Sequence, residues 1–441
     1  MKKLIPIVLI LVLLLCACGQ EAAGGEAAQS AAQSGEKAAA ASAAGDHTVI
    51  TLSGSGVKIS GGGARDEGDC VTISAAGTYE LTGAGSKMLV VDTGDDAMEV
   101  TLILNNAQIT NLSGPAVHVK QAKQFTLRLV GQSTLVSGEE AMLQSPDPEA
   151  SGAALLSEDD MDIEGEGSLI VCGYLNNGIG CKNDLDINSG DIAVLAANNG
   201  VRGNDSVQIK GGSLSVSAWG DGIKSTATTK EGKGYVELKG GSVNVEAWGD
   251  GIQAATELRI LDGSLTVIAR GDGVEDSSKA LKGESLVLLS GGQISLESQE
   301  AAIRCSTGHV EISGGSLSVF SLTEGVYAGE KNSAIGDIRI SGGELSISAG
   351  KQALKARGSF TVTGGSIRAL SGSEKQSAPT GSPSLLCAIT GAAGDDVQLG
   401  ELGSVQARQS YKTLLLVDSS LSSGQSVTVS NRTGSMEAQV R

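Results

Sequence analysis

Residues 210–223 have the sequence KGGSLSVSAWGDGI, and residues 239–252 have the sequence KGGSVNVEAWGDGI. Looser copies of the same phrase follow further along the chain. The second glycine of each copy falls at residues 212, 241, 263, 292, 315 and 343. The spacing between copies is therefore 29, 22, 29, 23 and 28 residues. A repeat period of about 20–50 residues indicates a solenoid or another repeat architecture.

Within each copy, apolar residues occupy every second position, which is the period of a β-strand. Leu214, Val216 and Ala218 share one face of such a strand, and Val207 and Ile209 belong to a shorter strand before it. Glycine between the two strands accepts the positive φ of a tight turn without steric strain. Short parallel strands with this period predict an all-β fold, a right-handed parallel β-helix whose coils lie ~4.8 Å apart.

Composition supports one narrow repeated core rather than several conventional domains. Of the 441 residues 63 are glycine, aromatic residues make up 2% and hydrophobic residues 40%. The aromatic residues are too few to organise two or three ordinary cores, and the hydrophobic content is too high for a disordered chain. The leucine-rich repeat and the β-propeller are excluded because their Leu/Asn and aromatic signatures are missing.

Five segments are expected along the chain. Residues 1–17 have two lysines, an apolar run and a cysteine-containing end, which together indicate a signal peptide. Residues 18–46 are rich in Ala, Gly, Ser and Gln and are expected to form a flexible tether. Residues 47–150 are expected to form an N-terminal cap or the first coils, residues 151–370 the regular coils, and residues 371–441 a loop and a β-rich C-terminal cap.

The end of the signal peptide, Leu15-Cys16-Ala17-Cys18, resembles the bacterial lipoprotein box. In proteins with this box the conserved cysteine is lipidated, so Cys18 is the expected lipidation site. The expected location is the outer face of the bacterial cell membrane, to which the lipid anchors the exported chain. A plain secretory signal peptide is the alternative.

Charge and cysteine content exclude two further classes of protein. The formal net charge of -18 argues against nucleic acid as a partner, because phosphate binding needs a basic face. The cysteines beyond the lipoprotein box show no CxxC spacing, which argues against a zinc site or a disulfide framework. They are expected to be small buried hydrophobic residues. They are Cys70, Cys172, Cys181, Cys305 and Cys387.

Equivalent positions of successive coils stack, and one such column is rich in oxygen ligands. It contains Asn177, Asn199, Asp221, Asp250 and Asp272. Carboxylates ~5 Å apart repel one another, and an oxygen-only set of this kind suits Ca²⁺. A metal site is therefore predicted at the three aspartates, with Asn199 as a weaker ligand. The alternative is that Asp-Gly is a favourable turn dipeptide whose carboxylates are solvated.

A second column, two positions earlier, contains both tryptophans of the chain. Trp219, Trp248 and Arg270 follow one another in it and are expected to point outward. Exposed aromatic rings beside polar groups commonly hold sugar rings, so these three residues and nearby Lys224 are predicted to bind carbohydrate. The alternatives are an aromatic ladder that only stabilises the coils, and ordinary surface charges.

Three stretches resemble bacterial carbohydrate-binding-domain proteins with a β-helix fold. They are GGSLSVSAWGDGIKS (211–225), GKGYVELKGGSVNVEAWGDGIQA (232–254) and LNNAQITNLSGPAVHVKQAKQFTLRLVGQSTL (104–135). The resemblance covers about residues 70–370. It implies a secreted or lipid-anchored protein, similar in fold to pectate lyases, that binds calcium, polygalacturonate and cellulose. It also implies Ca²⁺ at Asp221, Asp250 and Asp272.

Three functions remain open at this point. The first is a non-catalytic, monomeric protein that binds acidic or cellulosic polysaccharide with the help of Ca²⁺. The second is a calcium-dependent polysaccharide lyase of the pectate-lyase type, in which Arg270 or Lys224 is the candidate base. The third is a structural surface protein or adhesin, in which the columns serve only to stack the coils.

Overall fold

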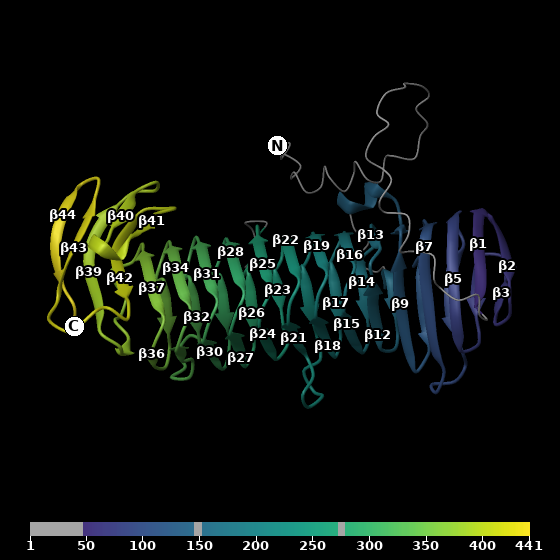
Figure 1. Ribbon diagram of the computed structural model, residues 1–441, viewed down its shortest axis with the longest axis horizontal. Helices are drawn as coiled ribbons and strands as arrows, with labels where there is room; N and C mark the ends of the chain where they lie inside the picture. Colours follow the sequence, from purple (N-terminus) through teal and green to yellow (C-terminus); the bar gives the residue numbers. More distant parts are fainter. Residues whose placement is uncertain (1–46, 145–151, 272–277) are drawn as a thin grey trace, which may run out of the picture.

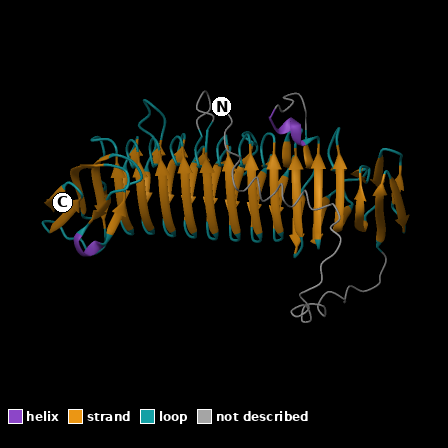
Figure 2. Ribbon diagram, turned by 90° about the horizontal axis from the view of Figure 1, so that it is seen from above, coloured by secondary structure: helices purple, strands orange, loops and turns teal. Residues whose placement is uncertain are grey.

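The computed structural model describes residues 47–144, 152–271 and 278–441. The predicted signal peptide, the tether and Cys18 lie outside these residues. The described chain forms an elongated stack of short strands, with the first strands at one end and the last strands at the other (Figure 1). Figure 2 shows that strands joined by short turns account for nearly all of this body. In the described part of the chain no helix has the length and hydrophobicity needed to cross a bilayer.

Each regular coil contributes one strand to each of three faces, which we call A, B and C. In one coil, β18 (Ser206–Ile209) lies on face B, β19 (Ser213–Ala218) on face A and β20 (Ile223–Ser225) on face C. Each of these strands pairs in parallel with its equivalent in the next coil, β21, β22 or β23. The chain is therefore a parallel β-helix, as predicted.

The strands of the three faces recur in the same order in every coil. Face A contains β13 (Ser168–Gly173), β16 (Asp191–Ala196), β19, β22 (Ser242–Ala247), β25 (Ser264–Ala269), β28 (Gln293–Ser298), β31 (Ser316–Ser321), β34 (Glu344–Ala349) and β37 (Ser366–Ser371). Face B contains β12 (Met161–Gly165), β15 (Asp184–Ile187), β18, β21 (Tyr235–Leu238), β24 (Glu257–Ile260), β27 (Leu286–Leu289), β30 (His309–Ile312), β33 (Ile338–Ile340) and β36 (Phe360–Val362). Face C contains β11 (Ala153–Ser157), β14 (Asn177–Cys181), β17 (Val201–Gly203), β20, β23 (Ile252–Gln253), β26 (Leu281–Gly283), β29 (Ile303–Cys305), β32 (Val326–Ala328) and β35 (Leu354–Ala356).

The interior of the coil is as narrow and aliphatic as the composition indicates. Leu214, Val216 and Ala218 are buried, as their alternation predicts. The glycines of the repeat phrase make the close approach of coils possible. Gly212 has a φ of +78°, and a Cβ there would lie 2.5 Å from the carbonyl oxygen of Gly190. A Cβ on Gly222 would lie 2.2 Å from Cγ1 of Val245, so neither position accepts a side chain.

The predicted role of the cysteines as buried small residues holds for most of them. Cys172, Cys181, Cys305 and Cys387 are buried, and Cys70 is half-buried. Burial in the coil raises the pKa of the Cys181 thiol to about 12 and that of Cys305 to about 11. These thiols therefore act as packing groups rather than nucleophiles.

Different strands close the two ends of the stack. At the N-terminal end, β1 (Thr48–Gly54) pairs antiparallel with β2 (Gly56–Ser60) and parallel with β5 (Gly77–Gly85). The coil then continues through strands such as β7 (Glu99–Asn111), β8 (Val117–Gln121), β9 (Gln124–Val130) and β10 (Gln132–Ser137). A short 3-10 helix, η1 (Glu140–Gln144), follows β10.

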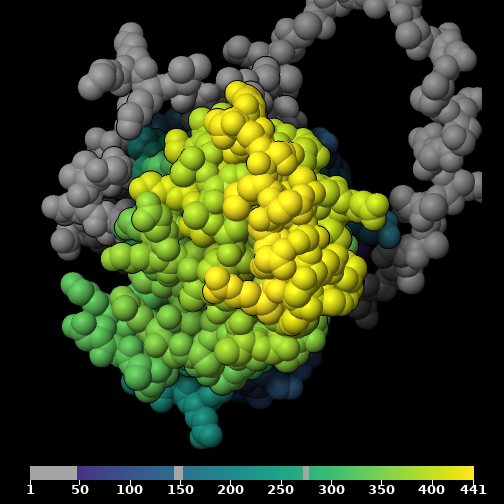
Figure 3. Space-filling model, turned by 90° about the vertical axis from the view of Figure 1, so that its left-hand side faces the viewer, coloured from purple at the N-terminus to yellow at the C-terminus, as the bar shows by residue number. Residues whose placement is uncertain are grey.

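At the C-terminal end the pairing changes from parallel to antiparallel. β37 pairs with β42 (Tyr411–Val417), which also pairs with β39 (Ser384–Gly391). A separate antiparallel sheet contains β40 (Asp396–Gln398), β41 (Ser404–Gln406), β43 (Ser426–Asn431) and β44 (Gly434–Gln439). Figure 3 looks onto these residues, in yellow, over the end of the stack. They cover the edge strands that a parallel coil would otherwise expose.

The alternation of longer and shorter intervals between the repeat phrases predicts that the extra residues leave one edge at every second coil and wall a groove there. In the structure the long segments do not all leave the same edge. Residues 226–234 follow β20 and residues 329–337 follow β32, so two of them do share an edge of face C. The middle long segment instead precedes β26, because Ile252 pairs with Leu281 and Gln253 with Lys282. The expectation of a wall at every second coil is therefore wrong.

Candidate functional site

A hollow of about 460 Å³ opens at the turns between face A and face C. We call it the tryptophan hollow. It is lined by Asn198, Asn199, Trp219, Gly220, Asp221, Lys224, Trp248, Gly249, Asp250, Gln253 and Lys282. Six of the residues predicted as sites from the sequence thus meet in one place, because they follow equivalent strands of neighbouring coils. They are Asn199, Trp219, Asp221, Lys224, Trp248 and Asp250.

The two tryptophan rings stack on each other. Their centroids are 4.7 Å apart and their planes differ by 15°, which matches the coil spacing. The aromatic ladder kept as an alternative is therefore present, and the same rings also line the hollow. Trp219 is 42% exposed, and the preceding residue of its column is Ala197, whose methyl group is too small to cover an indole. One ring of the pair can therefore still receive a ligand.

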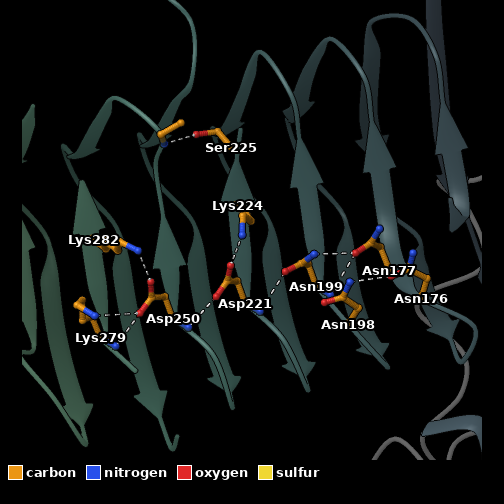
Figure 4. A network of polar contacts seen from close by, with 11 residues as sticks. Asn176, Asn177, Asn198, Asn199, Asp221, Lys224, Ser225, Asp250, Lys279 and Lys282 are labelled. Carbon is orange, nitrogen blue, oxygen red and sulfur yellow. Dashed lines mark hydrogen bonds and ion pairs between the residues drawn. The ribbon is translucent and has the colours of Figure 1, made fainter. Parts of the chain in front are cut away.

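The column of amides and carboxylates forms a ladder of hydrogen bonds between coils (Figure 4). The backbone N–H of Asn199 donates to Oδ1 of Asn177 over 3.1 Å, and that of Asp221 donates to Oδ1 of Asn199 over 3.1 Å. The N–H of Asp250 donates to Oδ1 of Asp221 over 2.8 Å, and that of Lys279 to Oδ1 of Asp250 over 2.9 Å. Asparagine and aspartate therefore have the same structural role here, since Oδ1 of each accepts a backbone N–H of the next coil. We call Asn177, Asn199, Asp221 and Asp250 the Asn/Asp ladder.

The second oxygen of each ladder aspartate faces a lysine. Lys224 Nζ lies 2.6 Å from Oδ2 of Asp221, and Lys282 Nζ lies 3.0 Å from Oδ2 of Asp250. Lys279 Nζ lies 4.0 Å from Oδ1 of Asp250. Burial raises the pKa of Asp250, and the charge of Lys282 opposes part of this rise. The aspartates are thus neutralised by side chains of the protein itself.

This arrangement does not fit a calcium ion at Asp221 or Asp250. A cation would have to displace an ammonium group that already occupies the position beside each carboxylate. The amide oxygen of Asn199 is likewise engaged, because it accepts the backbone N–H of Asp221 over 3.1 Å. Across residues 47–144, 152–271 and 278–441, no group of three or more His, Cys, Asp or Glu side chains is arranged to hold a metal ion.

Asp272 lies outside the described residues, and the column position predicted for it belongs to another residue. The N–H of Gly251 donates to the carbonyl oxygen of Lys279, as the N–H of Gly222 donates to that of Asp250. Lys279 therefore follows Asp250 in the ladder, and the prediction of three consecutive aspartates is wrong. The physical reason is burial, because Ala280 and Leu281 fill the interior positions of this coil.

A row of outward side chains on face C separates the tryptophan hollow from a second one. The row consists of Lys224, Gln253 and Lys282, which pair with one another along β20, β23 and β26. The second hollow, of about 540 Å³, lies beside the segment that follows β20. Lys282 could not be found from the repeat phrase, because that phrase aligns the third Gly-Asp-Gly, at residues 271–273, with the wrong strand. The buried Ala280-Leu281 pair was the available signal.

Arg270 does not reach the tryptophan hollow. It follows β25 beside Trp248 in its column, but its guanidinium group pairs with the carboxylate of Glu246. Lys224 does line the hollow and pairs with Asp221. Both candidate bases of the lyase hypothesis are thus engaged in ion pairs with carboxylates of the protein.

The family model and the relative found by comparison with known proteins have the same description, that of carbohydrate-binding domain-containing proteins. The family model of carbohydrate-binding domain-containing proteins matches residues 67–325 and 307–439. A carbohydrate-binding domain-containing protein of Acetivibrio thermocellus is 33% identical over 129 residues, which are 29% of this chain and only 45% of that relative. The solved structure of the polysaccharide lyase-like protein from C. thermocellum, a gadolinium derivative, is 31% identical, with a TM-score of 0.48. The match covers 53% of this chain and 96% of the chain in that structure.

Proposed function

Because the chain belongs to the family of carbohydrate-binding domain-containing proteins, we propose that it binds a polysaccharide in the tryptophan hollow without cleaving it. One observation carries this proposal. An exposed indole, Trp219, lines a hollow in which most of the other lining residues have hydrogen-bonding side chains. The stacked pair and the polar walls come from consecutive coils, so the coil geometry fixes their spacing.

The chemistry of the hollow suits a sugar ring. The C–H face of a pyranose is apolar and packs on an indole, while its hydroxyl groups need both donors and acceptors. Lys224, Lys282 and Gln253 offer donors, and the carboxylates of Asp221 and Asp250 offer acceptors. Acidic polysaccharide of the polygalacturonate kind, and cellulosic polysaccharide, are the proposed ligands.

Calcium has no part in the binding step that we propose. The family resemblance implies it, but lysine ammonium groups stand where a bridging cation would lie between the protein and a uronate. The same lysines can meet an acidic sugar directly. Calcium binding remains a prediction from the sequence, with its own test below.

We further propose that Cys18 anchors the protein to the outer face of the bacterial membrane. The lipoprotein box at residues 15–18 and the low-complexity tether after it support this location. Metabolic labelling with a fatty acid tests it: the wild-type chain is labelled and Cys18→Ser is not. Labelling of the Cys18→Ser chain, or none of the wild type, would contradict the proposal.

Affinity gel electrophoresis tests binding in the tryptophan hollow. Polygalacturonate or hydroxyethylcellulose in the gel retards the wild-type chain, and Trp219→Ala removes most of the retardation. Tyr235→Ala is the matched control, because Tyr235 is a half-buried aromatic residue on face B that contacts Arg259. Equal retardation of Trp219→Ala and wild type contradicts the proposal. When the chain is incubated with polygalacturonate in solution, the absorbance at 235 nm, which reports unsaturated lyase products, is expected to stay constant.

A further inference from the structure

A second group of side chains on face C lies beyond the tryptophan hollow. Tyr327 of β32 pairs with Arg304 of β29 on one side and with Lys355 of β35 on the other. The guanidinium carbon of Arg304 lies 4.1 Å from the centre of the tyrosine ring, and Lys355 Nζ lies 4.0 Å from it. Nε of Arg357 donates to the Tyr327 hydroxyl over 3.1 Å. We call these four residues the Tyr327 cluster.

The Tyr327 cluster has more positive than negative charge. Lys355 forms an ion pair of 2.7 Å with Glu324. Burial raises the pKa of Glu324, but the hydrogen bond and charge of Lys355 outweigh this and hold that pKa below its usual value. Among the described residues, no carboxylate lies within ion-pair distance of Arg304 or Arg357. Three cations thus face one carboxylate.

This excess is unusual for the molecule. The whole chain has a formal net charge of -18. On the same face Lys224 pairs with Asp221, and Lys282 pairs with Asp250. In the described part of the chain Arg304 and Arg357 have no such carboxylate, and they lie side by side around one tyrosine. The Tyr327 cluster therefore concentrates positive charge in a protein that has many more acidic than basic side chains.

The two guanidinium groups are already held in place. Nη1 of Arg304 donates to the carbonyl oxygens of Cys305 and Tyr327, and its plane lies against the tyrosine ring. Arg357 is fixed through Nε, which leaves its two terminal nitrogens for another partner. All four side chains of the cluster are half-buried. A fixed guanidinium fork matches the two oxygens of a carboxylate or a sulfate, and little ordering entropy remains to be lost.

We propose that the Tyr327 cluster binds an oxyanion, a carboxylate or a sulfate ester, on the polysaccharide whose neighbouring sugars occupy the tryptophan hollow. The inference rests on the proposed function. The tryptophan hollow extends onto face C at Gln253, and Tyr327 follows Gln253 on that face by three coils, or about 14 Å. A chain of a few sugars spans that distance. The cluster thus selects charged polymers over neutral ones without a divalent cation.

Affinity electrophoresis in EDTA with matched polymers tests this selection. Polygalacturonate is compared with its methyl ester, and cellulose sulfate with hydroxyethylcellulose, so that each pair differs mainly in charge. Arg304→Gln/Arg357→Gln is expected to lose at least tenfold in affinity for a charged polymer and to keep its affinity for the neutral partner. Arg339→Gln is the matched control, since Arg339 is an exposed arginine of face B that pairs with Asp337 and Glu311.

Each outcome of this experiment decides the inference. The variant Arg304→Lys/Arg357→Lys keeps the positive charges but loses the guanidinium forks. An intermediate loss of affinity for the charged polymer in this variant supports oxyanion binding by the Tyr327 cluster. Circular dichroism confirms that each variant folds. A double glutamine variant that still prefers the charged polymer overturns the inference. A wild-type chain that binds charged and neutral polymers equally also overturns it, yet leaves the proposed function intact if Trp219→Ala abolishes that binding. Absence of retardation by all four polymers refutes both.

Discussion

Replacing Asp221 by alanine or by asparagine separates the structural role of the Asn/Asp ladder from a metal-binding role. Oδ1 of Asp221 accepts the backbone N–H of Asp250 in the next coil, and Asn199 accepts the N–H of Asp221 in the same way. An asparagine at residue 221 can repeat what Asn199 already does. Alanine cannot, so the two substitutions are expected to differ sharply.

The expected loss of stability in Asp221→Ala follows from the burial of Asp250. Asp250 is 5% exposed, and its N–H would have no acceptor in Asp221→Ala. A buried donor without a partner destabilises a protein by about 1–3 kcal/mol. The loss of the partly exposed pair with Lys224 adds at most about 1 kcal/mol. Asp221→Ala is therefore expected to destabilise the chain by about 1–4 kcal/mol, and Asp221→Asn by no more than about 1 kcal/mol.

Urea denaturation and hydrogen exchange are the assays. Because the coils contact only their neighbours, exchange at the amide of Asp250 reports the local effect directly. That amide is expected to lose protection in Asp221→Ala and to keep it in Asp221→Asn. Asp262→Ala is the control, because Asp262 is exposed and its side chain accepts the backbone N–H of the next residue, Gly263. The reasoning is refuted if Asn and Ala destabilise equally, or if the Asp250 amide stays protected in Asp221→Ala.

Three further predictions concern the rest of the molecule. Iodoacetamide at pH 8 is expected to label Cys70 much faster than Cys181 or Cys305, because burial raises the pKa of the latter two to about 12 and about 11; peptide mass spectrometry checks this, and rapid labelling of Cys305 would contradict it. EDTA and CaCl₂ are expected to give the same melting temperature, because lysines occupy the cation positions of the ladder; a rise with CaCl₂ that Asp221→Asn abolishes would contradict this. The folded pKa of Glu324 is lowered, so its contribution to stability is present above the unfolded pKa and is lost as pH falls through the folded value. Glu324→Gln is expected to reduce the loss of stability below about pH 4.5, and an unchanged acid denaturation curve would argue against the pair with Lys355.

The fold could be predicted almost completely from the repeat phrase. Alternating apolar residues such as Leu214 and Val216 define the interior of each coil, and the glycines mark turns where a Cβ does not fit. The expectation of three consecutive aspartates in one column was wrong, because three phrases contain the letters Gly-Asp-Gly and only the first two of them stack. The burial of Ala280 and Leu281, rather than those letters, decides which residues stack.

The candidate site could be predicted as a location but not as chemistry. Stacked columns brought Trp219, Trp248 and Asp221 together, and the structure places all three around one hollow. The sequence could not reveal that each aspartate oxygen already has a partner, since that depends on distances from Lys224 and Lys282. A column of acidic residues therefore predicts a metal site only when the positions of the neighbouring lysine and arginine side chains are also known, because these side chains can neutralise the carboxylates.

Tryptophan fluorescence tests the central claim most directly. The chain has two tryptophans, and both line the tryptophan hollow, so the emission reports on this site alone. Titration with oligogalacturonates and cello-oligosaccharides that span several sugars is expected to change the emission along a saturable curve, for at least one of the two ligand types. Retention of the protein on the matching polymer with no change in emission at saturating oligosaccharide would place the polysaccharide elsewhere and contradict the account.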